Sequence, residues 1–226
     1  MKNVLVVAPH ADDEVLGCGG TIAKHVRSGD RVYVAIMTNA AFGAPELFSA
    51  ETIQSIRAEA LESHQVLGVL ETLFYDFPAP QLEQHPQYKI ANVINSLIKD
   101  KNIQTMYIPH KGDLHLDHGV IYNAALVSAR PVPGQSVRQI YAYETLSETE
   151  WGHPTVDAVF IPRFHNVLSE SDFENKIKAM ECFSSQLKEF PNTRSIKAIE
   201  HLAALRGAYI GANMAESFDI IRSIED

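Results

Sequence analysis

Short apolar runs rich in β-branched residues alternate along the chain with longer segments whose apolar residues recur at the period of a helix. The runs are too short for helices and are bounded by polar turns, which is typical of buried strands. The segments between them are typical of amphipathic helices. Alternation of the two patterns indicates βαβ units. We therefore predict an α/β fold of three layers (α/β/α), Rossmann-like, with a mostly parallel sheet.

The two patterns place the predicted elements along the chain. Strands are expected at residues 3–8, 31–38, 72–77, 105–110 and 137–144. Helices are expected at residues 16–27, 52–67, 88–99, 118–129, 172–186 and 195–211. Residues 217–222 are expected to form an edge strand. The helices between the first five strands then serve as crossover connections, so these strands run parallel.

Two polar segments follow predicted strands at the places where ligands bind in such a fold. In the strand order 3-2-1-4-5, the ligand crevice lies beyond the carboxyl ends of strands 1 and 4. The first strand runs into "PHADDE", residues 9–14, and the fourth into "PHKGDLHLDH", residues 109–118. Segments far apart in the sequence are therefore expected to face each other across one crevice.

The residue types in these segments favour a metal site. His10 and Asp13 are three positions apart at a strand-to-helix turn, a spacing that lets an imidazole and a carboxylate bind one ion. His118 would complete a set of three ligands with one open position, which is the pattern of catalytic zinc sites. Asp12 would then act as general base toward a water molecule held by the ion, whose charge lowers the pKa of that water.

Simpler explanations exist for each segment taken alone. Asp12, Asp13 and Glu14 could be acidic residues that the dipole of a helix favours in its first turn. Asp117 could cap a helix that begins at His118 while the neighbouring histidines are solvated. The occurrence of both segments at the ends of strands 1 and 4 favours the metal site. Glu14 itself is expected to support the start of the helix or to accept a hydrogen bond behind the ligands.

Composition narrows the function further. A chain of 226 residues with 46% hydrophobic residues can bury one large core, so we expect a single domain, 1–226. A formal charge of −9 argues against nucleic acids and anionic membrane surfaces as partners, which leaves small molecules. Two cysteines without regular spacing suit a reducing compartment, and no apolar segment is long enough for a signal peptide or a membrane span. We therefore expect a cytoplasmic protein without membrane insertion.

The motifs of other enzyme classes are missing. The glycines of "GCGG", residues 17–20, are followed by Ile22 where the dinucleotide-binding spacing requires glycine. The end of the second predicted strand, "MTNA", also lacks the acidic residue that would bind ribose. The chain has no GxSxG, HExxH or Walker A motif. The three glycines are better explained by close packing of the first helix on the sheet.

The same residues resemble a known family, the zinc-dependent N-acetylglucosaminyl deacetylases of the PIG-L or LmbE-like type. The resemblance runs through "VVAPHADDEVLGCGGTI", "IRAEALESHQVLGV", "GDLHLDH" and "RGAYIGANMAESF", and so covers most of the chain. It implies the LmbE-like form of the α/β/α fold and a bound Zn²⁺. Because members of this family are often oligomeric, it also implies a homo-oligomer.

The resemblance further implies roles for individual residues. The zinc ligands would be His10, Asp13 and His118. Asp12 would be the base, and His115 would be the charged or hydrogen-bonding group that stabilises the oxyanion, with Asp117 orienting it. Arg57 matches a family arginine that contacts the substrate, although a solvated salt bridge to Glu59 or Glu51 would also explain it.

Three further features of the sequence are a loop, a tyrosine and a glutamate outside the two polar segments. We expect the loop at residues 144–155, with Trp151 and His153, to border the pocket. Tyr209 is a candidate for a tyrosine near the site, and the alternative is a core aromatic residue on its helix. Glu216 matches a recurring family residue to which the sequence assigns no role.

These roles imply a zinc-dependent hydrolase that removes the acetyl group from an N-acetylated amino sugar, an N-acetylglucosamine-type conjugate, to give acetate and a free amine. Two alternatives stay open. A metal-dependent amidohydrolase acting on a non-sugar amide would have the same motifs. A non-catalytic module that binds zinc or sugar would hold the metal and release no acetate.

Overall fold

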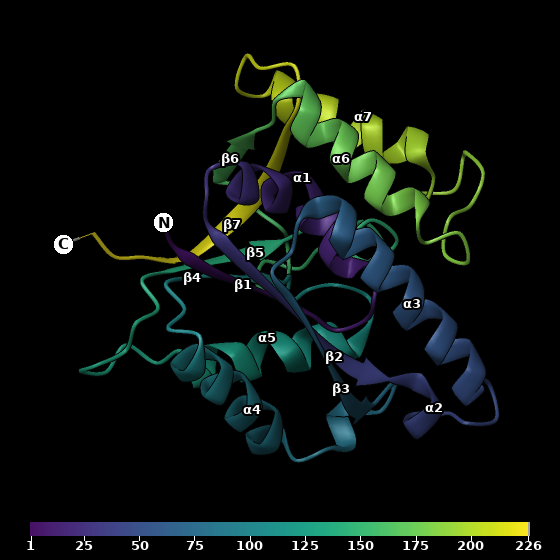
Figure 1. Cartoon of the computed structure of the whole chain (residues 1–226), viewed down its shortest axis with the longest axis vertical. Coiled ribbons are helices and arrows are strands. Elements are labelled where there is room, and N and C mark those ends of the chain that lie inside the picture. The colour runs from purple at the N-terminus through teal and green to yellow at the C-terminus, as the bar shows by residue number, and fades with distance from the viewer. Residues whose placement is uncertain (226) are drawn as a thin grey trace.

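The structure is a computed structural model, and it describes residues 1–225. The predicted domain 1–226 includes residue 226, which lies outside the described residues. Seven strands form one sheet in the order β3-β2-β1-β4-β5-β7-β6, and helices cover both of its faces (Figure 1). The predicted three-layer α/β/α fold is confirmed, with the order 3-2-1-4-5 over most of the sheet.

The first five strands are parallel and agree with the predicted runs to within a few residues. They are β1 (Asn3–Ala8), β2 (Arg31–Asn39), β3 (Glu71–Pro78), β4 (Thr105–Pro109) and β5 (Gln139–Tyr143). Alternate side chains of β1 enter two different cores, since Val4 and Val6 pack on one face and Leu5 and Val7 on the other. Burial on both faces explains why this strand reads as a continuous apolar run.

The remaining two strands are antiparallel additions to the sheet. β7 (Ala215–Ser223) pairs with β5, and β6 (Phe164–Val167) pairs with the other side of β7. The segment 217–222 is therefore a strand as predicted, but its predicted position at the edge was wrong. β6 forms that edge, and no pattern in the sequence indicated it, because the strand has four residues with His165 and Asn166 at its centre.

Helices cover the two faces of the sheet unequally. One face carries α1 (Asp13–Arg27), α3 (Ala50–Leu67), α6 (Glu170–Glu181) and α7 (Ile196–Ala208), and the other carries α4 (Gln87–Asp100) and α5 (Leu116–Ser128) (Figure 1). Two short elements were not predicted, α2 (Ala40–Gly43) and η1 (Leu82–Gln84). α6 ends before the predicted residue 186, and residues 182–195 form a loop between α6 and α7. No helix within residues 1–225 is long and apolar enough to cross a membrane.

The first helix packs closely on the sheet. A Cβ atom on Gly17 would lie 2.8 Å from Cγ of Tyr143 in β5 and closer still to Cδ2, so only glycine allows the observed approach. The other two glycines of the motif face α6 and the segment before it rather than the sheet. This packing fixes the position of α1, whose first residue is Asp13.

A buried ion pair ties α1 to α6 and β7. The Glu216 carboxylate accepts hydrogen bonds from the backbone N–H of Gly20 (2.9 Å) and of Thr21 (2.7 Å) in α1. Lys176 Nζ lies 2.5 Å from Glu216 Oε1 and donates to the carbonyl oxygen of Leu16 over 2.8 Å. Both buried charges are thus paired and hydrogen-bonded, which is the condition for burying them without a large cost. Glu216 therefore has a structural role.

We expect Gly17→Ala to lower the free energy of unfolding by about 1–3 kcal/mol, because the added methyl group overlaps the buried Tyr143 ring. Urea denaturation of the two proteins measures the difference. Gly119→Ala is the matched control, since Gly119 is also helical and a Cβ there would lie no closer than 3.4 Å to the carbonyl oxygen of Lys111. The control should be neutral or stabilised by up to about 1 kcal/mol; equal effects at both glycines would contradict the close packing.

Candidate active site

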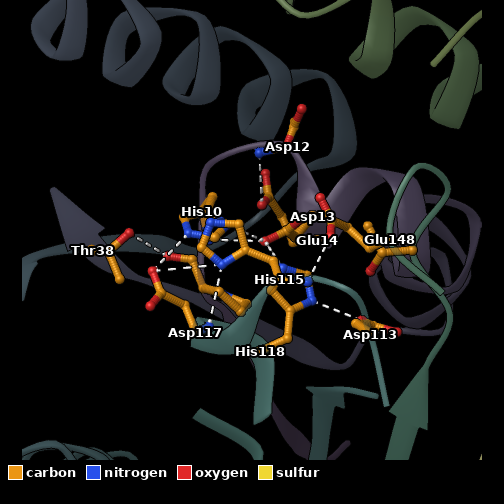
Figure 2. Close-up of polar contacts among 12 residues, drawn as sticks. His10, Asp12, Asp13, Glu14, Thr38, Asp113, His115, Asp117, His118 and Glu148 are labelled. Carbon is orange, nitrogen blue, oxygen red and sulfur yellow. Dashed lines mark hydrogen bonds and ion pairs between the residues drawn. The ribbon is translucent and has the colours of Figure 1, made fainter. Parts of the chain in front are cut away.

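The loops that follow β1 and β4 lie side by side, because these two strands are neighbours in the sheet. The β1–α1 loop and the start of α1 carry His10, Asp12 and Asp13, and the β4–α5 loop and the start of α5 carry His115, Asp117 and His118. Figure 2 shows the side chains from both loops gathered together. The two segments singled out in the sequence thus meet at the carboxyl ends of the strands.

His10, Asp13 and His118 form a compact group. Asp13 Oδ2 lies 3.4 Å from Nδ1 of His10 and 3.3 Å from Nε2 of His118, and one ligand atom from each residue lies within 4.8 Å of the others. Among the described residues, Asp13 Oδ1 has no hydrogen-bond partner, and His118 Nε2 has none besides its ion-pair contact with Asp13 Oδ2, although both atoms are buried. Because buried polar atoms are ordinarily satisfied, these two atoms fit a bound cation. Two imidazoles and a carboxylate suit zinc and other divalent first-row metals.

Two further carboxylates orient the imidazole rings. Asp113 Oδ2 lies 2.7 Å from Nδ1 of His118, and Asp117 Oδ2 lies 3.2 Å from Nε2 of His10. Each ring is thereby turned so that its other nitrogen is directed toward Asp13 (Figure 2). Metal-binding histidines commonly have a carboxylate partner of this kind, which fixes the ring and raises its basicity.

The carboxylates also set the charges of the group. Burial alone lowers the pKa of both imidazoles, but the carboxylates around them outweigh it and raise the pKa to about 9 for His10 and about 10 for His118. For Asp13, burial acts to raise the pKa, yet the two imidazoles hold it well below its ordinary value. Asp13 is therefore an anion, which is the form of a carboxylate that binds a metal ion.

A second group of possible ligands, His10, His115 and Asp117, shares one residue with the first. Its atoms already have partners. Asp117 Oδ1 accepts the N–H of Leu82 (3.1 Å), Asp117 Oδ2 faces His10, and Nδ1 of His115 accepts the N–H of Asp117 (3.2 Å). The first group keeps unpartnered atoms and is therefore the better candidate for a metal site.

Asp12 directly precedes Asp13 of the first group, and it lines a pocket together with His10. Its φ of 109° falls in the left-handed region, a strained conformation for a residue with a side chain and one that is frequent at functional sites. Asp12 Oδ2 accepts a hydrogen bond of 2.9 Å from Nη1 of Arg194. Burial raises the pKa of Asp12 to about 8, against the opposing effect of the Arg194 charge. A carboxyl group that titrates near neutral pH suits general base catalysis.

A chain of buried hydrogen bonds holds the backbone of Asp12 in place. Glu14 Oε2 accepts the N–H of Asp12 (3.2 Å), and Glu14 Oε1 lies 2.9 Å from Nε2 of His64. His64 Nδ1 in turn contacts Oγ1 of Thr72 over 2.8 Å. Glu14 thus accepts a hydrogen bond behind the candidate ligands, as the sequence suggested, and it stabilises the strained turn.

His115 precedes α5 and caps it. Its Nδ1 accepts the N–H of Asp117, so the proton of the neutral imidazole is on Nε2. Burial and the neighbouring His10 lower the pKa of His115 to about 4, so the ring is uncharged at neutral pH. The Asp117 carboxylate lies 3.8 Å from Nδ1 of His115 and hydrogen-bonds His10 instead. Asp117 therefore contacts His115 through its backbone N–H rather than through the carboxylate.

A pocket with a volume of about 320 Å³ lies next to the candidate metal group, and His10 of this group is part of the pocket lining. Its polar wall is formed by His10, Asp12, His115, Glu148, Gln186 and Arg194. Glu148 Oε2 accepts the backbone N–H of His115 (3.0 Å), and burial raises the pKa of this carboxyl group. Residues that are far apart in the sequence, from His10 to Arg194, thus line one pocket.

Arg57 also lines the pocket, from the first half of α3. Its Nη2 donates to the carbonyl oxygen of Tyr75 (2.8 Å) and to Asp76 Oδ1 (2.7 Å). The salt bridge to Glu59 or Glu51 that the sequence left open is therefore replaced by one to Asp76, at the end of β3. The guanidinium faces the site with its charge already compensated.

Some residues singled out in the sequence lie elsewhere. Trp151 is 53% exposed and, like His153, does not line the pocket, so the loop at residues 144–155 contributes through Glu148 instead. Tyr209 is 60% exposed at the end of α7 and belongs neither to the pocket nor to the core.

Arg194 was not predicted from the sequence as a residue of the site. It comes from the loop between α6 and α7 and connects three parts of the site, because its guanidinium donates to Asp12, to Ser147 Oγ (2.7 Å) and to Gln186 Oε1 (3.2 Å). No local pattern marks it, since the hydrogen bond to Asp12 spans 182 positions.

The sequence of this chain is similar to that of known proteins. A sequence profile of the PIG-L family, described as GlcNAc-PI de-N-acetylase, matches residues 5–129, which include both loops. A Bacillus cereus protein described as a probable N-acetyl-alpha-D-glucosaminyl L-malate deacetylase 2 is 30% identical over 195 residues, which are 82% of this chain and 84% of that protein.

Solved structures share the whole fold. The conserved protein TT1542 from Thermus thermophilus has a TM-score of 0.76 at 25% identity, covering 100% of this chain and 97% of that one. The 4-carboxy-2-hydroxymuconate hydratase GalB from Pseudomonas putida KT2440 has a TM-score of 0.79 at 18% identity, covering 100% and 99%. Because a hydratase has the same fold, the fold alone does not specify the reaction.

We expect Asp113→Asn to weaken Zn²⁺ binding by roughly ten- to a hundredfold, because the amide orients His118 less firmly and no longer raises its basicity. Competition with a chromogenic chelator measures the affinity. Asp157→Asn, at an exposed loop position, is the matched control and should bind Zn²⁺ as the unchanged protein does. An unaltered affinity in the Asp113 variant would argue that His118 does not bind the ion.

Proposed function

This chain belongs to the PIG-L family, and we propose that it hydrolyses the acetamide group of an N-acetylated amino sugar, releasing acetate and a free amine. The observation that carries the proposal is the group of His10, Asp13 and His118, with buried atoms of Asp13 and His118 that lack hydrogen-bond partners, next to a pocket that His10 and Asp12 line. A metal-binding group next to a potential base is what amide hydrolysis requires.

We propose Zn²⁺ as the ion, held by His10, Asp13 and His118. Three protein ligands of the nitrogen and oxygen type with an open position are usual for catalytic zinc. The bound ion would supply Lewis acidity, which polarises the amide carbonyl and makes water more acidic. The outer carboxylates of Asp113 and Asp117 would keep both imidazoles correctly oriented for it.

Asp12 is the proposed general base. Arg194 holds Asp12 Oδ2, so Oδ1 takes the proton of the attacking water. The water oxygen forms a bond to the carbonyl carbon, and the carbon–nitrogen bond then breaks. The proton taken by Asp12 passes to the leaving nitrogen, which departs as the free amine. The strained and hydrogen-bonded turn around Asp12 keeps the carboxylate in this position before substrate arrives.

His115 is the proposed stabiliser of the oxyanion. With Nδ1 engaged by the backbone of Asp117, its Nε2–H is available to donate to the oxygen that gains charge. The neutral form is sufficient for this role, so the imidazole does not need a second proton. Arg57, which also lines the pocket, is the proposed donor to the sugar.

Asp12→Asn is expected to leave Zn²⁺ bound while lowering the rate of acetate release by roughly a hundred- to ten-thousandfold, because the amide cannot accept the proton. The measurement is acetate release from a panel of N-acetylglucosamine conjugates by the zinc-loaded protein. Asp100→Asn, an exposed carboxylate at the end of α4, is the matched control and should retain full activity.

The outcomes of this experiment separate the candidate functions. Full activity in Asp12→Asn would remove Asp12 from the mechanism. Stoichiometric zinc without acetate release from any conjugate would favour a non-sugar amide substrate or a binding module.

We expect His115→Leu to lower kcat by roughly a hundred- to a thousandfold, since one preorganised donor to the oxyanion is lost. His115→Gln should retain part of the activity, because its side-chain amide can still donate an N–H. Single-turnover acetate release compares the two variants. Equal losses in both would contradict the assignment of His115 as a hydrogen-bond donor.

A further inference from the structure

The pocket also has an apolar wall. Phe48, Ile53 and Ile56 line it from the start of α3 and the segment before it. Ile53 and Ile56 are three positions apart on the helix, so they lie on one face together with Arg57. Ile36 at the end of β2 and Pro80 after β3 continue this wall.

These side chains are left incompletely covered by the protein itself. Phe48 is 38% exposed, and Ile53 and Ile56 are half-buried, although each belongs to a residue type that is usually fully buried. When an apolar part of a ligand covers an exposed apolar stripe inside a pocket, both surfaces are removed from water and the free energy of the complex is lowered.

The charges of the pocket argue against an anionic ligand. Both guanidinium groups already have carboxylate partners, since Arg57 pairs with Asp76 (2.7 Å) and Arg194 with Asp12 (2.9 Å). Glu148 adds another carboxylate to the lining. A negatively charged aglycone would therefore have to compete with Asp76 and Asp12 for these guanidinium groups.

We infer that the substrate of this chain carries an uncharged, apolar aglycone on its N-acetylated amino sugar, and that this group lies against Phe48, Ile53 and Ile56. The inference rests on the proposed deacetylase function and adds the substrate class. The polar wall takes the acetamide, while the apolar wall selects among conjugates. A free sugar would leave the apolar wall exposed to water, and a carboxylate-bearing aglycone would have to compete with Asp12 and Asp76 for the two arginines.

The test compares three substrates of the zinc-loaded protein: phenyl N-acetylglucosaminide, the 4-carboxyphenyl analogue of the same anomer, and free N-acetylglucosamine. We expect kcat/KM for the phenyl compound to exceed that for the free sugar by roughly ten- to a hundredfold, because the ring is removed from water. The carboxyphenyl compound has the same ring with one added charge. We expect its kcat/KM to be about tenfold lower than that of the phenyl compound.

Variants of the apolar wall provide an internal check. Ile56→Ser and, separately, Phe48→Ala are expected to lower the ratio of kcat/KM for the phenyl compound over the free sugar by roughly tenfold. This ratio does not depend on the fraction of folded protein, so a folding defect alone leaves it unchanged. Leu61→Ser is the control, because Leu61 is an apolar residue of the same helix that is 51% exposed and outside the pocket.

The possible results are distinguishable. If all three substrates are hydrolysed with similar kcat/KM, or the carboxyphenyl compound is preferred, the inference is overturned while the proposed function stands. If none of the three releases acetate, the proposed function fails and the inference fails with it. A wall variant that leaves the ratio unchanged would show that the aglycone does not lie against the side chain that was replaced.

Discussion

The buried carboxylate of Asp13 is the constraint on which the rest of the site depends. A carboxylate removed from water is stable only where hydrogen bonds or positive charges compensate it. Asp13 obtains this compensation from the N–H and imidazole of His10 and from the imidazole of His118, which follow two different strands. The two rings are in turn fixed by Asp117 and Asp113. Parallel pairing of β1 with β4 is what brings these partners within reach of one another.

Much of the fold could be predicted because its central strands are buried on both faces. Such strands leave an unbroken apolar run in the sequence, as in β1 and β2, and the helices between them leave the helical period. β6 left neither signal, since it is held by pairing with β7 rather than by its own apolar content. The order of the last two strands therefore depended on a contact that no local pattern records.

The candidate site was predictable to the extent that its residues cluster in sequence. His10, Asp12 and Asp13 follow one strand directly, and His115 and His118 follow another, so the rule for ligand sites in parallel sheets brought them together. The pairing of acids with imidazoles was not predictable. Asp117 is two positions from His115 yet orients His10, because the start of α5 turns its carboxylate inward. Which carboxylate serves which ring is decided by the three-dimensional path of a helix start, not by spacing.

Arg194 has a consequence for how the site is completed during synthesis. The N-terminus of a chain leaves the ribosome first. Every candidate metal ligand therefore emerges before Arg194, whose guanidinium pairs with Asp12. Until Arg194 emerges, the ion pair that Asp12 forms in the folded protein cannot form. The loop between α6 and α7, which also reaches Ser147, supplies the missing charge last. A nascent chain that ends after His118 but before Arg194 therefore contains every residue of the candidate metal group but lacks the charge that pairs with Asp12.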